Sequence, residues 1–218
     1  MVYYYDDISK LNASSMKEVM EVIPIERIQK ANKYRRIEDT YLSAMSYAML
    51  QYGLYKELLN ISNLELFYNQ FGKPYLMDKG IYFNISHCKA GVACGISNDE
   101  IGVDIQDVIH VKDDVLKRIC SPEEIQYINK SDYPSEAFTK LWTYKESYLK
   151  AIGKGITEDL KQIVFSFEDN LVKRDGFILT SIHESNYFIT ACSSSVEYFT
   201  KVSWEEFYDF VMSKKHSN

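Results

Sequence analysis

The hydrophobic and polar positions along the chain follow two periods, one helical and one strand-like. Between Ile25 and Leu59, apolar side chains recur at three- and four-residue spacing, which predicts a long helix with one apolar stripe. Gly53 lies in its second half and marks a place where the helix could break in two. Shorter apolar or alternating runs predict strands at residues 64–68, 81–86, 91–96 and 101–105.

The second half of the chain repeats this order of helices followed by strands. The Ser-Pro-Glu-Glu run at 121–124 is a capping box with proline at the first helical position, so a helix begins there. A longer helix is expected from about Pro134 to Gly153, where glycine favours a stop. Strands are expected at residues 163–167, 176–182, 187–192 and 198–202. Residues 92–97 and 189–194 are faintly alike, a weak indication of internal duplication.

Composition and charge narrow the class of protein. The 218 residues are 46% hydrophobic and 26% charged, which is typical of a globular chain of one or two domains. A net charge of −6 argues against a general nucleic-acid binder. No apolar run approaches membrane-spanning length, and the first residues lack the order of a signal peptide. We therefore expect a cytoplasmic protein whose four cysteines are reduced, without a membrane partner.

The first candidate functional residues are acids, one at the end of a predicted strand and one on a predicted helix. No P-loop or Rossmann glycine motif is present that would bind a nucleotide instead. Asp104 ends an apolar run and shares a face with Gln106, an arrangement that suits a magnesium anchor. On this motif alone, a solvent-facing acid at a strand end is the more ordinary interpretation. Glu146 and Lys150 are four residues apart on one helical face, as in a surface ion pair. The aromatic surroundings of that face favour a functional role instead.

Further candidates are basic or polar groups that could hold an anion. Ser86 and His87 follow an apolar strand and could both donate hydrogen bonds to an anion, although a lone histidine is more often structural. Basic side chains also gather at the start of the first predicted helix: Arg27, Lys30, Lys33, Arg35 and Arg36. A solvated helix face and an anion site explain that cluster equally well.

Five segments occur in one order along the chain and together resemble a known family. They are FGKP at 71–74, FNISH at 83–87, IGVDI at 101–105, RICSPEE at 118–124 and LWTYKESYLK at 141–150. This combination closely resembles the 4′-phosphopantetheinyl transferase superfamily, and it is most similar to the long, surfactin-synthetase-activating type. The resemblance extends from about Arg27 to the strands after Gly176. Its specific part is the pairing of Gly-Val-Asp with W-x-x-K-E-x-x-x-K.

The resemblance implies an α+β fold of two similar halves related by a pseudo-twofold axis, each a long helix packed on a small antiparallel sheet. Coenzyme A would lie between the halves. We expect residues 1–103 to carry coenzyme A contacts and residues 104–218 to carry the metal and catalytic residues. The implied reaction moves 4′-phosphopantetheine from coenzyme A to a serine of an apo-acyl or peptidyl carrier protein, releases 3′,5′-ADP and requires Mg²⁺. The expected oligomeric state is a monomer.

The resemblance also implies residue roles. Asp104, Gln106 and Glu146 would hold Mg²⁺, Glu146 would accept the serine proton, and Lys150 would stabilise the departing phosphate. The expected coenzyme A contacts are Arg27, Lys30, Lys73, Pro74, Ser86, His87 and Lys145. Two positions depart from the family pattern: Gln106 replaces an acid found in many members, and Leu42 lies where an arginine is often found.

Two other functions stay open on the sequence. A non-catalytic relative that only binds coenzyme A or a nucleotide is kept open by Gln106, which removes one negative charge from the metal site. A module that only docks carrier proteins is a third possibility. Such a module would have no use for an acid, a lysine and a histidine at these spacings. The carrier itself, whether of fatty-acid, polyketide or peptide synthesis, is not specified.

Overall fold

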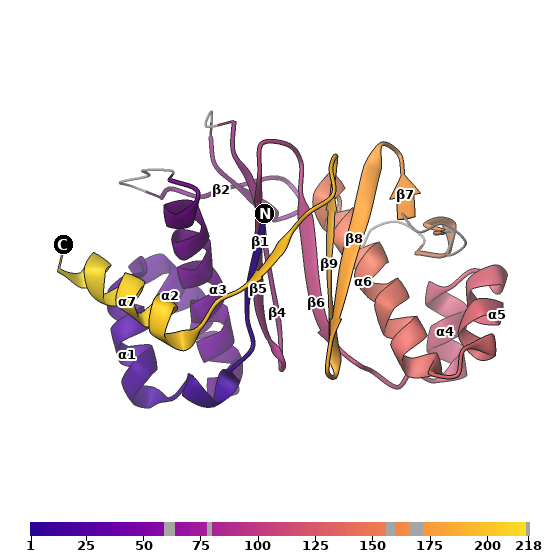
Figure 1. Cartoon of the computed structure of the whole chain (residues 1–218), viewed down its shortest axis with the longest axis horizontal. Helices are drawn as coiled ribbons and strands as arrows, with labels where there is room; N and C mark the ends of the chain where they lie inside the picture. Colours follow the sequence, from indigo (N-terminus) through magenta and orange to yellow (C-terminus); the bar gives the residue numbers. More distant parts are fainter. Residues whose placement is uncertain (59–63, 78–79, 156–159, 166–171, 217–218) are drawn as a thin grey trace.

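The computed structural model describes residues 1–58, 64–77, 80–155, 160–165 and 172–216. Two four-stranded sheets lie side by side in the middle of the molecule, and helices cover the outer face of each (Figure 1). Among the described residues, no helix is both long and apolar enough to cross a bilayer.

The first half consists of helices packed on a mixed sheet. Its elements are β1 (Val2–Tyr5), α1 (Ala13–Glu21), α2 (Ile25–Ala31), α3 (Ile37–Lys56), β2 (Phe67–Tyr68), β3 (Pro74–Tyr75), β4 (Tyr82–Cys88) and β5 (Gly91–Ser97), with a 3₁₀ turn at Ile8–Lys10. The sheet order is β10-β1-β5-β4. β10 (Phe199–Lys201) pairs parallel with β1, and the other pairs are antiparallel. Helix α3 packs against β4 and β5.

The second half has the same plan around a fully antiparallel sheet. Its elements are β6 (Gly102–Asp107), α4 (Asp113–Ile119), α5 (Pro122–Lys130), α6 (Pro134–Ile152), β7 (Val172–Arg174), β8 (Phe177–Glu184) and β9 (Tyr187–Ser193), with a 3₁₀ turn at Leu160–Gln162. The sheet order is β6-β9-β8-β7. Helix α6 packs on β6 and β9.

The two halves share one chain order and one strand order. Each runs strand, long helix, strand, strand: β1-α3-β4-β5 in the first and β6-α6-β8-β9 in the second. In each, the first strand pairs antiparallel with the last. The faintly similar segments 92–97 and 189–194 belong to the equivalent strands β5 and β9. The predicted α+β class with two similar halves is confirmed, with one difference: the parallel β1–β10 pair makes the first sheet mixed.

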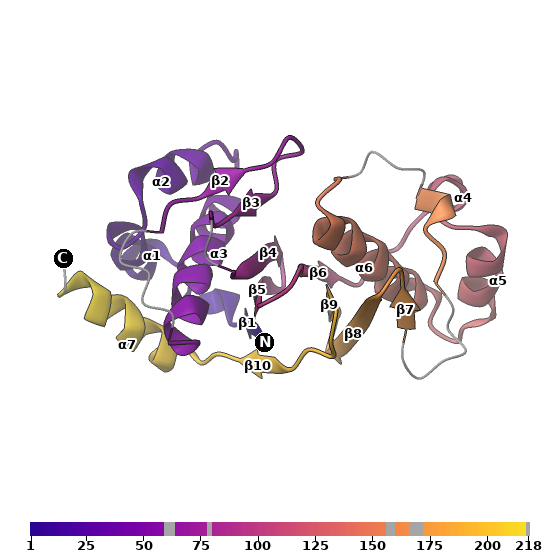
Figure 2. The same cartoon turned by 90° about the horizontal axis from the view of Figure 1, so that it is seen from above.

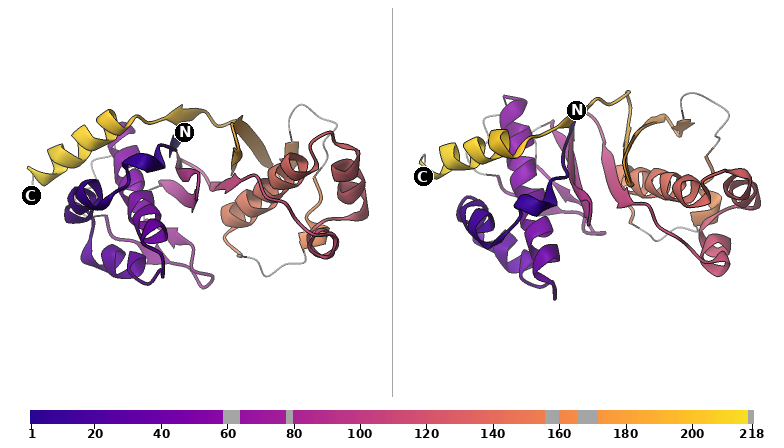
Figure 3. Two further views of the ribbon diagram at one scale, coloured as in Figure 1. Left: turned by 90° about the horizontal axis from the view of Figure 1, so that it is seen from below. Right: turned by 60° about the horizontal axis from the view of Figure 1, so that its bottom comes forward.

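The end of the chain returns to the first half. After β9 it crosses back through β10 to α7 (Trp204–Lys215), which lies beside the N-terminal helices (Figures 2 and 3). Phe207 and Phe210 of α7 are buried in the core that contains Tyr3 and Tyr52. The expected division between residues 103 and 104 falls inside β6. The functional division of labour between the two sides stays a prediction.

Several predicted elements differ in detail. The long helix predicted from residue 25 is two helices, α2 and α3, and the chain breaks between them rather than at Gly53. Gly53 lies within α3 and does not end it. A Cβ at this position would lie 2.7 Å from Ile96 Cδ1, so glycine allows the helix to pack close to the sheet. Residues 163–165 are not a strand, and residues 59 and 166–167 of the predicted elements lie outside the described residues. The strand predicted at 64–68 is reduced to Phe67–Tyr68.

Candidate active site

The two halves meet along β4 and β6, the facing edge strands of the two sheets. Side chains, rather than a strand ladder, join them. The Asn84 carboxamide oxygen accepts a hydrogen bond from the Val103 amide at 2.9 Å, and Ser86 Oγ accepts one from the Ile105 amide at 3.4 Å. Polar side chains from both halves are therefore brought together at this seam.

An ion pair lies at the centre of the seam. The Lys150 ammonium of α6 donates to Asp104 Oδ1 of β6 at 2.5 Å and to Ser86 Oγ of β4 at 3.0 Å. Ser86 Oγ in turn donates to Asp104 Oδ1 at 3.0 Å. Asp104 is buried and Lys150 is about one-quarter exposed. Three residues predicted from separate motifs are thus in direct contact.

Gly102 explains why β6 and α6 lie so close. A Cβ at this position would lie 1.9 Å from the Ser147 carbonyl oxygen and 2.3 Å from the Ala151 amide nitrogen, both backbone atoms of α6. Only glycine permits this approach. The glycine of the Gly-Val-Asp motif therefore sets the distance between Asp104 and the helix that carries Glu146.

Glu146 adds a second carboxylate with an unused oxygen. Glu146 Oε1 and Asp104 Oδ2 are both buried, and neither has a hydrogen-bond partner in the described part of the chain. Burial raises the pKa of Glu146, nearby Lys150 lowers it, and the negative charge of Asp104 raises it. The two acids therefore lie close enough to repel one another, and each keeps an oxygen available for a ligand.

These residues fit a hard cation such as Mg²⁺. Buried carboxylate oxygens without partners are the donors that such a cation prefers. Gln106 is half-buried, two residues beyond Asp104 on the same strand, and can add a neutral oxygen. No cluster of three His, Cys, Asp or Glu suited to a metal occurs within the residues that the structure describes. A third protein ligand here would have to be an amide such as that of Gln106.

His87 and the basic residues of α2 surround the first-half side of the seam. Burial and the positive charge of Lys150 lower the pKa of His87, and the opposing effect of Asp39 does not reverse this, so the imidazole is neutral at neutral pH. Arg27 is largely buried: its guanidinium carbon lies 4.9 Å from the Tyr47 ring centre. Lys30 is exposed.

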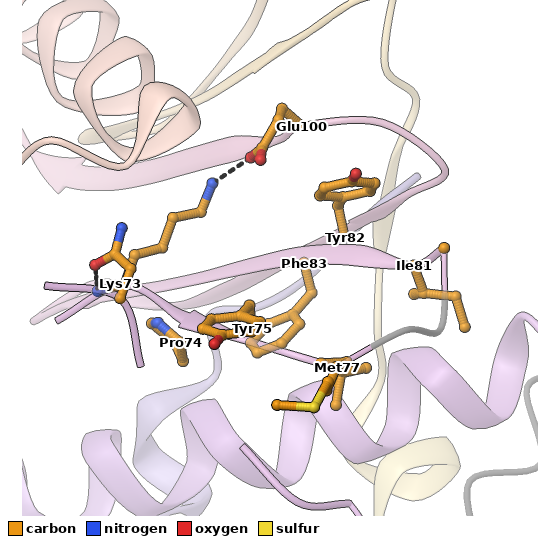
Figure 4. A pocket seen from close by; sticks show the side chains of 11 residues that line it. Lys73, Pro74, Tyr75, Met77, Ile81, Tyr82, Phe83 and Glu100 are labelled. Carbon is orange, nitrogen blue, oxygen red and sulfur yellow. Dashed lines mark hydrogen bonds and ion pairs between the residues drawn. The ribbon is translucent and has the colours of Figure 1, made fainter. Parts of the chain in front are cut away.

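A small pocket of about 240 Å³ lies between the seam and the turn that connects β2 to β3. It is lined by Phe71, Gly72, Lys73, Pro74, Asn84, Ile85, Leu149, Lys150, Gly153 and Gly155. The predicted residues Lys73, Pro74 and Lys150 thus share one pocket. The Lys73 ammonium itself binds Glu100 Oε2 at 2.7 Å and the Ala151 carbonyl at 2.8 Å. Figure 4 shows this ion pair at the edge of another hollow, lined by Pro74, Tyr75, Met77, Ile81, Tyr82 and Phe83.

The expectation that Lys145 faces a phosphate is wrong. Its side chain is fully buried on the opposite side of α6, where the ammonium binds Glu124 Oε2 at 2.8 Å. It also donates to the carbonyls of Leu160 at 2.7 Å and Ile119 at 3.1 Å. All three of its N–H donors are therefore used. Neighbouring positions on a helix point in different directions, so Lys145 faces away from the seam although Glu146 is the next residue.

Sequence reasoning missed four residues that shape the site: Asn69, Asn84, Glu100 and Glu124. Asn69 organises the loop that lines the small pocket, and an Asn three residues before a Gly is an available turn signal. Asn84 and Glu100 gave no local signal, because each acts on a segment distant in the sequence. Glu124 was predicted only as part of the capping box, and its bond to Lys145 was not. Leu42, where an arginine is often found in the family, is buried in the first core and brings no charge to the seam.

Comparisons with known proteins agree with this geometry. The family model described as the 4′-phosphopantetheinyl transferase superfamily matches residues 100–195, which include Asp104, Glu146 and Lys150. The chain is 25% identical over 211 residues to 4′-phosphopantetheinyl transferase Sfp of Bacillus subtilis. The aligned residues cover 90% of this chain and 94% of that protein. The part of the chain that carries the seam residues is thus similar to the 4′-phosphopantetheinyl transferase superfamily.

A second relative gives a stronger but shorter match. The chain is 34% identical over 135 residues to 4′-phosphopantetheinyl transferase gsp of Aneurinibacillus migulanus. That match covers 60% of this chain and 56% of gsp. A solved holo-[acyl-carrier-protein] synthase of Thermotoga maritima is 18% identical, with a TM-score of 0.38, over 45% of this chain and 64% of that one.

Proposed function

We propose that this protein transfers the 4′-phosphopantetheine moiety of coenzyme A to a serine of an apo-acyl or peptidyl carrier protein and releases 3′,5′-ADP. The observation that carries the proposal is the meeting of Asp104, Glu146 and Lys150 at the seam, where two buried carboxylate oxygens have no partner. The match of residues 100–195 to the 4′-phosphopantetheinyl transferase superfamily supports the same reaction.

Asp104, Gln106 and Glu146 would hold Mg²⁺, which would supply positive charge against the phosphate oxygens of coenzyme A. In the transfer, a bond forms between the serine oxygen and the phosphorus that carries pantetheine. The bond from that phosphorus to the oxygen retained by 3′,5′-ADP breaks. Glu146 would accept the serine proton, and its raised pKa makes its carboxylate a better base. Lys150, already aimed at the seam, would stabilise the departing phosphate.

The remaining coenzyme A contacts are assigned by position. Ser86 and His87 lie beside Lys150, where a hydroxyl and a neutral imidazole can donate to phosphate oxygens. Arg27 and Lys30 would contribute positive charge from α2. The loop containing Lys73 and Pro74 would line the nucleotide end. Its backbone and side chains form the wall of the small pocket that faces Lys150.

The proposal also includes the compartment and the assembly state. The free state of Cys88, Cys94, Cys120 and Cys192 supports a reducing cytoplasm. We propose that the enzyme acts there as a monomer, because both halves that form the seam come from one chain.

The test is to incubate the protein with coenzyme A, MgCl₂ and an apo-carrier, and to measure the carrier mass. Transfer adds about 340 Da to the carrier. A carrier whose target serine is replaced by alanine serves as the control.

Gln106 favours one alternative function, that of a relative that binds coenzyme A without turnover, because the proposed metal site has one negative charge fewer than in many members. Binding of coenzyme A by calorimetry without any gain of carrier mass would establish that alternative.

A further inference from the structure

We propose that Asn69 and Lys73 form a clamp that fixes the end of α6 to the turn between β2 and β3, so that both walls of the small pocket are held as one unit. Asn69 and Glu100 are then positioning residues for the proposed transfer. This inference rests on the proposed function for its consequence in catalysis, but the clamp itself is a structural arrangement of this chain.

Asn69 first shapes its own loop. Its Oδ1 accepts hydrogen bonds from the amides of Phe71 and Lys73, each at 2.9 Å. The backbone closes the same turn, with the Asn69 amide donating to the Lys73 carbonyl at 3.0 Å. Gly72 adopts a positive φ of 84°, which glycine adopts readily. A single side-chain oxygen therefore fixes the backbone that lines the pocket.

The other end of the same carboxamide reaches the second half of the molecule. Asn69 Nδ2 donates to the Gly153 carbonyl at 2.8 Å, and the Lys73 ammonium donates to the Ala151 carbonyl at 2.8 Å. The last carbonyls of a helix have no partners within the helix and carry partial negative charge. Asn69 and Lys73 satisfy two carbonyls at the end of α6 from outside.

Gly153 makes room for this contact. Its φ of 69° ends the helix in the left-handed conformation. A Cβ there would lie 3.0 Å from Asn69 Nδ2 and 3.2 Å from Lys73 Cδ. The glycine thus ends the helix and also permits the loop to approach it.

Glu100 completes the clamp. It lies just before β6 and holds the Lys73 ammonium at 2.7 Å (Figure 4). The Lys73 side chain is mostly buried, with 13% exposed, although Glu100 is half exposed. Lys73 therefore connects the loop, the helix end and the strand that carries Asp104. Because Lys150 lies in the last turn of α6, its position depends on this anchor.

The Asn69→Asp variant separates the two tasks of Asn69. Aspartate keeps an oxygen for the Phe71 and Lys73 amides, but it cannot donate to Gly153 and it places a negative charge against the helix end. Asn69→Ala removes both tasks. We expect Asn69→Asp to weaken coenzyme A binding by about three- to tenfold, measured by calorimetry. We also expect it to lower kcat, because Lys150 loses its fixed position.

Amide hydrogen exchange distinguishes the clamp from a role of Asn69 that is confined to its own loop. Only the clamp predicts a change of exchange rate at the end of α6. In Asn69→Asp, the amides of the last turn of α6, including Gly153, should exchange faster while those of Phe71 and Lys73 stay protected. In Asn69→Ala, both groups should exchange faster. Glu100→Gln, which keeps the shape but weakens the ion pair, should show a smaller change of the same kind in α6.

The matched control is Lys56→Met, which removes an exposed ion pair of similar length, 2.8 Å to Glu206, that connects α3 to α7. It should change neither coenzyme A affinity nor exchange in α6. Unchanged exchange of the α6 end in Asn69→Asp would overturn the clamp, whatever the activity. If the wild-type protein binds no coenzyme A, the proposed function fails, and the exchange data still judge the clamp separately.

Discussion

Asp104 and Glu146 are both buried acids of the seam, but their surroundings differ. Asp104 Oδ1 receives the Lys150 ammonium and the Ser86 hydroxyl, whereas Glu146 Oε1 has no partner among the described side chains and backbone groups. Burial of Glu146, which the charge of Lys150 offsets only in part, disfavours its charged form and raises its pKa. An acid with a raised pKa is suited to accept a proton, and it costs the fold stability when ionised.

Glu146→Gln should abolish transfer while leaving the fold at least as stable. Since the folded pKa of Glu146 lies above its ordinary 4.5, wild-type stability falls as pH rises through the range between the two values. In EDTA at pH 8, denaturation of the variant should show an equal or higher free energy of unfolding. This difference should vanish below about pH 4.5, where both states are protonated. A clearly less stable variant at pH 8, or transfer within a few fold of wild type, would contradict the assignment.

Gln106→Glu should lower the magnesium concentration needed for half-maximal transfer, with little change in maximal rate. A charged ligand replaces a neutral one, and the affinity of hard-cation sites rises with ligand charge. Transfer rate measured against magnesium concentration checks this, with Asp104→Ala as the comparison that should lose activity. If Gln106→Glu needs as much metal as wild type and Asp104→Ala stays active, the metal is held elsewhere.

Helix α6 is the element on which the site depends, and it faces two environments. Glu146 and Lys150 face the seam, whereas Lys145 points into the second core and pairs with Glu124. Glu124 also receives the Ser121 amide at 2.8 Å, so the same carboxylate caps α5 and anchors α6. The register of α6 against the second half is therefore fixed by a buried ion pair.

Lys145→Met should destabilise the protein by about 3–5 kcal/mol, because it leaves Glu124 buried without its counter-charge. Adding Glu124→Gln should recover part of the loss, since glutamine is neutral and can still serve in a capping box. Urea denaturation of the single and double variants measures both effects. A double variant no more stable than Lys145→Met alone would mean that the unpaired charge of Glu124 is not the cause.

Gly102→Ala should cost at least about 3 kcal/mol, because its Cβ would overlap backbone atoms of α6 that no side-chain movement can relieve. Gly176→Ala is the matched control: no atom lies within 4 Å of its added Cβ, although its φ of 83° still strains alanine. Thermal unfolding should therefore show a clearly larger loss for Gly102→Ala. Similar losses for both would show that backbone conformation, rather than close packing, dominates.

At the scale of the whole molecule, the seam is held by side chains. Asn84 and Ser86 of β4 bond the backbone of β6, and the last segment of the chain, β10 and α7, returns to the first half. The two halves are thus joined by the crossing of the chain, by specific polar contacts, and by a buried apolar cluster that includes Val2, Val103 and Ile189. The site lies where these contacts are, so its geometry depends on how the halves sit together.

Asn84→Ala should weaken the coupling of the halves. It leaves the buried Val103 amide without its acceptor, at a cost of about 1–3 kcal/mol. Hydrogen exchange should show faster exchange at Val103 and its neighbours in β6, with the outer strand β7 unaffected. Coenzyme A affinity should fall as well, since Asn84 also lines the small pocket. Unchanged exchange in β6 would mean that the seam does not depend on this contact.

The sequence by itself determined the elements whose signals are local. The capping box at Ser121 and the stop at Gly153 were predicted correctly because capping chemistry acts within a few residues. Local motifs also brought Asp104, Glu146 and Lys150 to attention. The resemblance implied the α+β class, and the predicted order of helices and strands agreed with it. By contrast, β1, α1, α4 and α7 were not predicted. The strand β1 is buried at all four positions, so it shows no alternation. Helix α7 does show helical spacing at Phe207, Phe210 and Val211, a signal that the sequence reasoning did not use.

Tertiary structure alone decided which side chains meet. Spacing placed Lys145 beside Glu146, but adjacent helical residues face different directions, and the buried partner of Lys145 comes from a separate helix. Asn69 and Gly153 are 84 positions apart, and Asn84 and Val103 are 19 apart, so no local pattern links them. Local chemistry fixes where an element begins and ends. Contacts between distant segments depend on how complete elements pack, and that packing determines the site.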